Sequence, residues 1–244
     1  MKTFKYTFPE KSVNITAISD THIGDKLFNR GALIPYLEDA DYLILNGDIM
    51  NTATKQSVSF AYGSNPQADL DEAVAIFKPY AHKIIAINEG NHEHRVAKEV
   101  GLSLTQLFAH QLGLLDKYAG TASYIFMNIG PNKILYRLYA THGFGGGRTT
   151  GAKANKLEGL SDGIDADIYV VSHTHQPMVF YQDYMRSNAR TYKLDQVTKV
   201  YVNTGAFLDY GGYAERFNFK PSTIITPTVE LFGTKHHIAV RGGI

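Results

Sequence analysis

The chain has no cysteine among its 244 residues, so neither a disulfide nor a thiolate metal site can form. Any bound metal ion must therefore be held by nitrogen and oxygen ligands. Neither sign of charge dominates, because 24 lysines and arginines stand against 23 aspartates and glutamates. That balance gives no overall field that favours non-specific nucleic-acid binding, although a local basic patch stays open.

Long apolar runs are also missing. No run approaches the roughly 18 apolar residues that a membrane-spanning helix needs. The first residues, from Met1 to Tyr6, lack the apolar core of a secretion signal. We therefore expect a cytoplasmic protein with no membrane segment.

What is present is an ordinary globular composition. Hydrophobic residues make up 44% of the chain and charged residues 19%, which argues against disorder. A length of 244 residues allows one substantial core, and no repeat, low-complexity tract or linker divides the sequence. We predict a single domain over residues 1–244.

Strand-like and helix-like segments alternate in the first half, and the second half is richer in strands. The first half predicts strands at residues 13–19, 42–46 and 83–88, and helices at residues 27–37, 68–82 and 93–112. Pro35 weakens the first helix, and Gly101 predicts a break in the last. The second half predicts a hairpin from residues 124–129 and 133–141, a polar helix after residues 143–147, and strands at 167–172, 178–185, 199–203 and near 228–240.

Acidic, amide and imidazole side chains follow five of these strands. They are Asp20 and His22, Asp48, Asn91 and His92, His142, and His173 and His175. Because ligands of open α/β sheets bind beyond the carboxyl ends of the strands, we expect these side chains to face one crevice. Residues i and i+2 of an extended segment project to the same side, so Asp20 with His22, and His173 with His175, could each aim two ligands at one place.

This mixture of carboxylate, imidazole and amide groups suits Mn²⁺, Fe or Zn²⁺. A lone aspartate or histidine after a strand is usually a turn residue, but an ordered set of seven is a stronger signal. About seven ligands are too many for one tetrahedral ion and fit two ions that share a carboxylate. Two metal ions held about 3.5–4 Å apart in this way clamp the attacking and leaving oxygens in phosphoester hydrolysis.

The ordered motifs resemble those of the calcineurin-like metallophosphoesterase superfamily. They read Asp20-Thr21-His22, Gly47-Asp48, Gly90-Asn91-His92-Glu93, Thr141-His142-Gly143 and Ser172-His173-Thr174-His175. They span residues 20–175, about two thirds of the chain. The resemblance implies an α/β fold, a four-layer α/β/β/α sandwich with two mixed sheets.

Carried over to the matching positions, the resemblance also implies roles. One ion would be bound by Asp20, His22 and His175, the other by Asn91, His142 and His173, and Asp48 would bridge them. A bridging hydroxide would attack phosphorus, and His92 would donate a proton to the departing oxygen. Mn²⁺ is the leading candidate for both ions, and Fe, Zn²⁺ and Ni²⁺ also suit nitrogen and oxygen ligands.

Three further residues belong to the predicted site. Many relatives have a second aspartate three residues after the bridging one, where it orients the catalytic histidine; here the residue is Asn51. Asn51 can accept a hydrogen bond from His92, but it cannot stabilise an imidazolium as a carboxylate does. Arg95 and Arg148 could each bind a substrate phosphate, or could be an ordinary helix-end or loop residue.

Three functions compete. A two-metal phosphoesterase acting on phosphodiesters leads, with nucleotides, nucleic-acid ends or phosphoproteins as candidate substrates. A DNA or RNA nuclease of the repair type is second, although the chain has no basic excess. A non-catalytic scaffold, like the retromer subunit of this fold, is third and predicts missing ligands, whereas every ligand position is filled here. The sequence does not indicate an oligomeric state.

Overall fold

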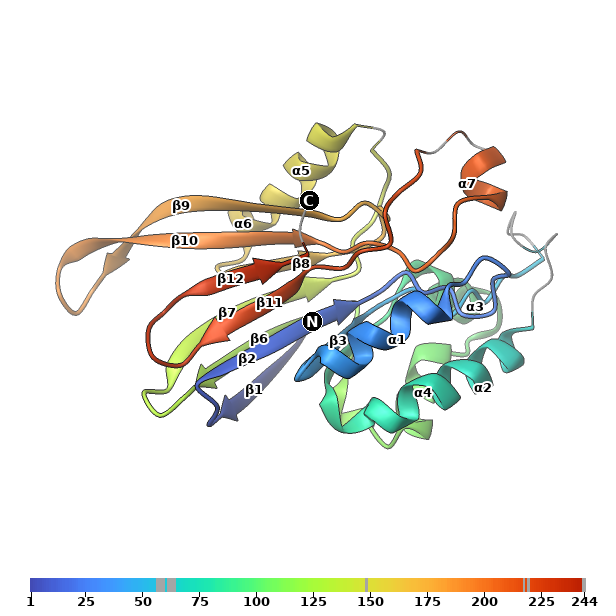
Figure 1. The fold of residues 1–244 in the computed structure, drawn as a ribbon, viewed down its shortest axis with the longest axis horizontal. Helices are drawn as coiled ribbons and strands as arrows, with labels where there is room; N and C mark the ends of the chain where they lie inside the picture. Colours follow the sequence, from blue (N-terminus) through green and yellow to red (C-terminus); the bar gives the residue numbers. More distant parts are fainter. Residues whose placement is uncertain (56–59, 61–64, 148, 217, 219, 243–244) are drawn as a thin grey trace.

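Two six-stranded sheets pack face to face in the computed structural model, and helices cover their outer faces (Figure 1). The structure describes residues 1–55, 60, 65–147, 149–216, 218 and 220–242. Both sheets contain parallel and antiparallel pairs, which confirms the predicted α/β architecture with two mixed sheets. In the described part of the chain, no helix is both long and apolar enough to cross a membrane.

The first sheet, called sheet I, has the order β12-β11-β2-β3-β4-β5. Its strands are β2 (Ser12–Ile18), β3 (Tyr42–Asn46), β4 (Ile84–Asn88), β5 (Tyr118–Gly120), β11 (Thr228–Phe232) and β12 (Ile238–Arg241). The run from β2 to β5 is parallel, while β11 and β12 are antiparallel to their neighbours. The carboxyl ends of β2, β3 and β4 therefore lie at one edge.

The second sheet, sheet II, has the order β1-β6-β7-β8-β10-β9. Its strands are β1 (Lys2–Phe8), β6 (Ala122–Ile129), β7 (Ile134–Thr141), β8 (Ile168–Val171), β9 (Met178–Asn188) and β10 (Lys193–Asn203). Strands β7, β8 and β10 are parallel to one another, and β6 and β7 form the predicted hairpin. Ile44 of sheet I and Leu138 and Val170 of sheet II belong to the apolar core between the sheets.

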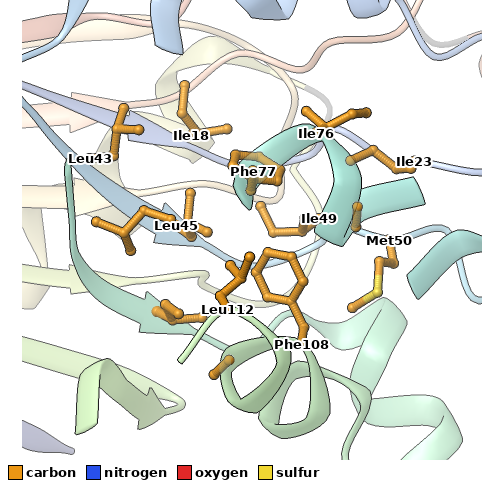
Figure 2. Packing of buried hydrophobic residues seen from close by; sticks show 14 of the residues in the cluster. Ile18, Ile23, Leu43, Leu45, Ile49, Met50, Ile76, Phe77, Phe108 and Leu112 are labelled. Atoms are coloured by element: carbon orange, nitrogen blue, oxygen red, sulfur yellow. The ribbon is translucent and has the colours of Figure 1, made fainter. Parts of the chain in front are cut away.

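The helices form the outer layers. They are α1 (Arg30–Asp39), α2 (Pro66–Phe77), α3 (Asn91–Val100), α4 (Leu104–Gln111), α5 (Thr150–Glu158), α6 (Leu160–Gly163) and α7 (Gly212–Arg216), with 3₁₀ turns η2 (Lys78–Lys83) and η3 (Leu115–Lys117). Phe77 of α2 and Phe108 of α4 meet edge to face in the core against sheet I (Figure 2). Leu157 of α5 packs against the opposite face of sheet II with Tyr169 and Tyr201.

Proline and glycine residues account for where two helices end. The helix predicted at 68–82 ends as an α-helix at Phe77 and continues as η2, because Pro79 lacks the N–H that an α-helix needs. Gly101, with φ of 74°, ends α3 and confirms the predicted break. Pro35 lies inside α1 without ending it, and the buried Leu33 and Leu37 hold that helix against the core.

Two strands were missed and two are longer than predicted. β1 alternates polar residues with Phe4, Tyr6 and Phe8, a period-two pattern that predicts a strand, whereas β5 is too short to give such a signal. β9 and β10 are 11 residues each, and their outer halves project as a hairpin beyond sheet I (Figure 1). That hairpin is held by cross-strand pairing and not by burial, so hydrophobicity does not reveal its length.

Candidate functional site

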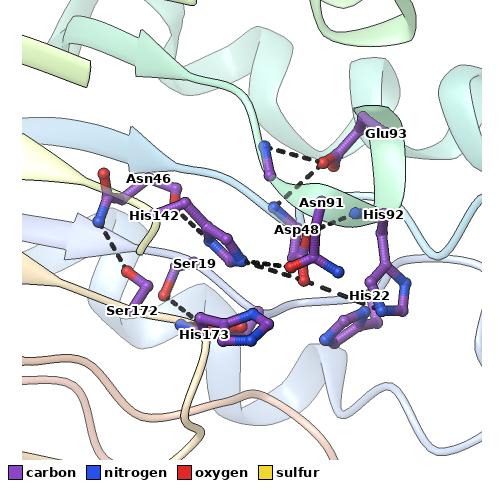
Figure 3. A network of polar contacts seen from close by, with 12 residues as sticks. Ser19, His22, Asn46, Asp48, Asn91, His92, Glu93, His142, Ser172 and His173 are labelled. Atoms are coloured by element: carbon purple, nitrogen blue, oxygen red, sulfur yellow. Dashed lines mark hydrogen bonds and ion pairs between the residues drawn. The ribbon is translucent and has the colours of Figure 1, made fainter. Parts of the chain in front are cut away.

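The side chains that follow the strand ends gather at one end of the sandwich. There the carboxyl ends of β2, β3 and β4 in sheet I meet those of β7 and β8 in sheet II (Figure 3). Within the described residues, three groups of acidic and imidazole side chains have ligand atoms close enough to share a cation. They are Asp20, His22 and His175; His22, Asp48 and His92; and Asp48, His142 and His173.

The loops that present these residues are not extended. Asp20, Asp48 and His173 have φ of 49°, 50° and 69°, in the left-handed region that non-glycine residues rarely occupy. His22 and His175 have φ of 46° and 54°. None of these segments is extended, so the argument from an extended segment does not hold for them. Asp20 and His22 nevertheless enter one group, whereas His173 and His175 enter different groups, as the resemblance implies.

The first cluster, defined as Asp20, His22 and His175, joins β2 to β8. Nε2 of His175 lies 3.2 Å from Oδ1 of Asp20 and 3.2 Å from Nε2 of His22. The other oxygen of Asp20 accepts hydrogen bonds from Ser19 Oγ at 2.7 Å and from the main-chain N of His173 at 3.2 Å. Oδ1 of Asp20 is buried and makes no hydrogen bond within the described part of the chain.

The second cluster, defined as Asp48, Asn91, His142 and His173, joins β3 and β4 to β7 and β8. Nε2 of His142 lies 3.2 Å from Oδ2 of Asp48 and 3.1 Å from Oδ1 of Asn91. The rings of His142 and His173 meet edge to face, with centroids 5.2 Å apart. Asp48 also shares a group with His22, so it lies between the two clusters.

These residues fit divalent cations. Ligand atoms at about 2.0–2.2 Å from an ion lie about 2.8–3.1 Å apart at neighbouring corners of an octahedron and about 3.3–3.6 Å apart at those of a tetrahedron. The separations of 3.1–3.2 Å in both clusters agree with those spacings. Oδ1 of Asp20 is buried with the His175 imidazole beside it but no hydrogen bond within the described residues, so a cation there would offset the cost of its burial.

Neighbouring charges outweigh burial at one carboxylate and one imidazole of the two clusters. Burial raises the pKa of Asp20, but His175 outweighs it and brings the pKa to about 2. Burial lowers the pKa of His142, yet Asp48 and Asp20 raise it to about 10. The carboxylates thus hold positive charge on an imidazole in the metal-free protein, and a bound cation would displace that proton.

Glu93 holds the main chain around Asp48 in place. This role was not predicted from the sequence, although Glu93 is the last residue of the Gly-Asn-His-Glu motif. Its buried carboxylate accepts hydrogen bonds from the main-chain N of Asp48 at 3.1 Å, Met50 at 2.8 Å and Gly90 at 3.2 Å. Burial and the nearby charge of Asp48 raise the pKa of Glu93 to about 7. A Cβ on Gly90 would lie 2.1 Å from Asp48 N, so only glycine allows this approach.

His92 stands beside the clusters with a fifth of its side chain exposed. Its Nε2 lies 3.9 Å from Oδ2 of Asp48, and its Nδ1 lies 3.0 Å from the main-chain oxygen of Asn51. The expected partner was the Asn51 side chain, whereas the contact runs to the backbone carbonyl. Burial, together with Arg95 and His175, lowers the pKa of His92, while Asp48 and the Asn51 carbonyl oppose that shift.

Of the two arginines predicted to bind phosphate, Arg95 is among the described residues. Arg95 is partly buried on α3, and its pKa is lowered by burial and raised by Asp48 and Glu93, so it lies within electrostatic reach of the second cluster. Arg148 lies outside the described residues.

The part of the chain that carries these clusters matches a known protein family. The family model described as calcineurin-like phosphoesterase matches residues 13–202. A search of curated protein sequences gives no match.

The solved structures that the chain resembles include three bacterial proteins. One is Yfce, a phosphoesterase from E. coli, with 18% identity over 95% of this chain and 100% of that chain and a TM-score of 0.43. Another is a metallophosphoesterase from Sphaerobacter thermophilus, with 15% identity over 95% and 88% and a TM-score of 0.45. The third is a conserved protein from Streptococcus pneumoniae described as a predicted phosphoesterase, with 15% identity over 94% and 98% and a TM-score of 0.39.

Proposed function

The chain belongs to the calcineurin-like phosphoesterase family, and we propose that it hydrolyses phosphodiesters with two divalent metal ions held where the two sheets meet. The observation that supports this most strongly is the pair of ligand clusters joined at Asp48. A set of nitrogen and oxygen donors with one carboxylate between two groups matches what a two-ion hydrolytic site needs. We expect the whole activity to reside in one domain over residues 1–244 of a cytoplasmic protein.

Each ligand then has a role. One ion would be held by Asp20, His22 and His175, the other by Asn91, His142 and His173, with Asp48 shared. We propose Mn²⁺ as the native ion, and Fe, Zn²⁺ and Ni²⁺ also fit these donors. Bound there, the ions would supply the charge that acidifies a water molecule and neutralises phosphoryl oxygens.

His92 would serve as the general acid. In the imidazolium form, the Nδ1–H of His92 would donate a hydrogen bond to the Asn51 carbonyl, and the Nε2–H, on the side of Asp48, would give its proton to a leaving oxygen. Because burial lowers the pKa of His92, its acid form is scarce above neutral pH. Leaving groups that depart without a proton should therefore depend on His92 least.

Arg95 would hold a non-bridging phosphoryl oxygen, which its partly buried position near Asp48 supports. Arg148 would be a second phosphate contact, on the basis of its place after the glycine-rich segment 143–147.

The test measures hydrolysis of bis-p-nitrophenyl phosphate and p-nitrophenyl phosphate by metal-stripped protein, with and without added Mn²⁺. We expect Mn²⁺-dependent cleavage of the diester and a loss of about 10³-fold or more in Asp48→Asn. Asp167→Asn is the matched control, since Asp167 is equally buried but pairs with Arg137 and Arg186 away from the clusters.

Two other outcomes would each favour a different function. Cleavage of the monoester alone would replace the phosphodiesterase proposal with a phosphatase. Folded protein that binds no Mn²⁺ and cleaves neither substrate would overturn the proposal in favour of a scaffold. Nucleotides and single- and double-stranded nucleic acids follow as substrates if the diester is cleaved.

A further inference from the structure

The candidate site is built from two sheets, so its geometry depends on how the sheets are held together. Sheet I supplies Asp48 and Asn91, and sheet II supplies His142 and His173, to the second cluster. A ligand set holds an ion tightly only if each member stays within about 0.5 Å of its proper place. Something must therefore fix the register between the carboxyl ends of β3 and β4 and those of β7 and β8.

Asn46, the last residue of β3, makes three contacts across this junction. Its Nδ2 donates to the main-chain oxygen of Thr141 at 2.8 Å and to Ser172 Oγ at 2.7 Å. Its own main-chain oxygen lies 2.9 Å from Nδ1 of His142 (Figure 3). One residue thus contacts the positions just before His142 and His173, and it also stands two residues before Asp48.

Asn88, the last residue of β4, completes the link. Its Nδ2 donates to Oδ1 of Asn46 at 2.7 Å and to the main-chain oxygen of Ala140 at 3.1 Å. Both asparagine side chains are fully buried. The residue two positions before Asn46 on β3 is Ile44, which packs in the apolar core. An apolar side chain could therefore pack at this face, and burying an amide there costs free energy unless it is hydrogen-bonded.

We propose that the Asn46–Asn88 amide pair is a positioning device that sets the affinity of the second cluster for its ion. This inference rests on the proposed function and deepens it. The Asn46 carbonyl fixes which nitrogen of His142 carries the proton, and so leaves Nε2 for the ion. The Nδ2 groups fix the strand ends that carry His142 and His173 relative to Asp48.

The first cluster takes one contact from the segment that the amide pair holds, the hydrogen bond from the main-chain N of His173 to Asp20, and its other contacts lie elsewhere. Ser19 donates to Asp20 and also pairs with Thr204 Oγ1 at 2.6 Å, so the position of Asp20 depends on the end of β10. His175 reaches Asp20 directly. The amide pair should therefore act on one ion and leave the other nearly unchanged, which a general loss of stability would not do.

The test is a Mn²⁺ titration of metal-free protein by calorimetry, with electron paramagnetic resonance to detect a coupled pair of ions. Asn46→Leu and Asn88→Leu remove the amides at similar volume. We expect one of the two Mn²⁺ affinities to fall about 10–100-fold, the other to stay within about twofold, and the coupled signal to give way to that of a single ion.

Thr228→Val is the matched control. It removes a buried hydrogen bond of 2.9 Å between Thr228 and Thr16, within sheet I and away from the ligand loops, and should leave both affinities as in the wild type. The double variant Asn46→Leu, Asn88→Leu replaces both partners of one bond by apolar groups, a change that proteins tolerate better than a single orphaned partner. It serves as the test variant if either single variant does not fold.

Two results would overturn the inference: an equal loss of both affinities, or two unchanged affinities in folded variants. A wild-type protein that binds no Mn²⁺ would instead overturn the proposed function. A wild type that binds two ions while the variants lose neither overturns the positioning role alone.

Discussion

The interface between the two sheets is apolar along its middle and polar at its carboxyl end, although the same strand faces form both. Ile44, Leu138 and Val170 lie in the inter-sheet core, whereas Asn46 and Ser172 come two residues after Ile44 and Val170. Side chains two apart on a strand share a face, so the face that forms the core also aims the site inward. Within a few residues of one strand, the same face thus changes from apolar side chains that form the core to buried polar side chains that form the candidate site.

This comparison predicts that changes at the carboxyl end should alter catalysis and changes in the middle should alter stability. The largest expected effect is that of His92→Ala. For a phosphodiester with an alkoxide leaving group, we expect kcat/KM to fall about 10²–10⁴-fold, because no acid protonates the departing oxygen. For a p-nitrophenyl ester the loss should be within about tenfold, and the unfolding free energy should change little.

His94→Ala is the control for His92→Ala, since His94 is half-exposed and lies beside Glu89. It should retain the activity of the wild type on both leaving groups. An equal loss for both leaving groups in His92→Ala would count against the general-acid role.

In the apolar middle, Leu138→Ala should lower the unfolding free energy by about 2–5 kcal/mol, because it leaves a cavity between the sheets. The kcat of the protein that remains folded should not change. Urea unfolding and active-site-normalised kinetics measure the two quantities. Leu135→Ala, on the same strand but 40% exposed, should cost less than about 1 kcal/mol. A tenfold fall in kcat for Leu138→Ala would show that the middle also tunes the site.

A smaller effect concerns pH, at Asp69 of α2, which accepts a hydrogen bond from the main-chain N of Thr52 at 2.9 Å. Burial raises the pKa of Asp69 to about 6, above its usual value of about 3.9. The folded state therefore binds this proton more tightly than the unfolded state. The resulting stability is fully present below about pH 4 and is lost as pH rises to about 6.

Asp69→Asn keeps an oxygen acceptor for Thr52 and removes the titration. We expect the variant to gain stability relative to the wild type between pH 4 and pH 7, as measured by urea unfolding of metal-free protein at both pH values. Asp71→Asn, on the exposed side of the same helix, should run parallel to the wild type. A gain that is the same at pH 4 and pH 7 would contradict the assignment.

The smallest effect should come from the Asn51 side chain, since His92 contacts the backbone oxygen of that residue. Asn51→Ala should leave the pH dependence of kcat/KM unchanged. Asn51→Asp adds a negative charge near the imidazole and should move the basic limb upward by about one pH unit. An unaltered profile in Asn51→Asp would remove any role for the charge at this position.

Much of the architecture could be predicted because its signals are local. The apolar runs at residues 42–46 and 83–88 gave β3 and β4 to within a residue, and Gly101 gave the break between α3 and α4. β1 was missed although Phe4, Tyr6 and Phe8 alternate with polar residues, whereas its pairing with β6, as in Lys2 beside Ser123, could not be predicted because it joins residues over 100 positions apart. The protruding part of β9 and β10 was missed because little of it is buried.

The sequence by itself determined most of the strands and which polar residues follow them, because strand formation depends on near neighbours and on the period of apolar residues. It also carried the motif order that indicates the family. Only the tertiary structure decided that His92 bonds to a backbone carbonyl and that two asparagines join the sheets. Those contacts link distant segments whose relative position follows from the packing of the whole sandwich, and no local pattern encodes them.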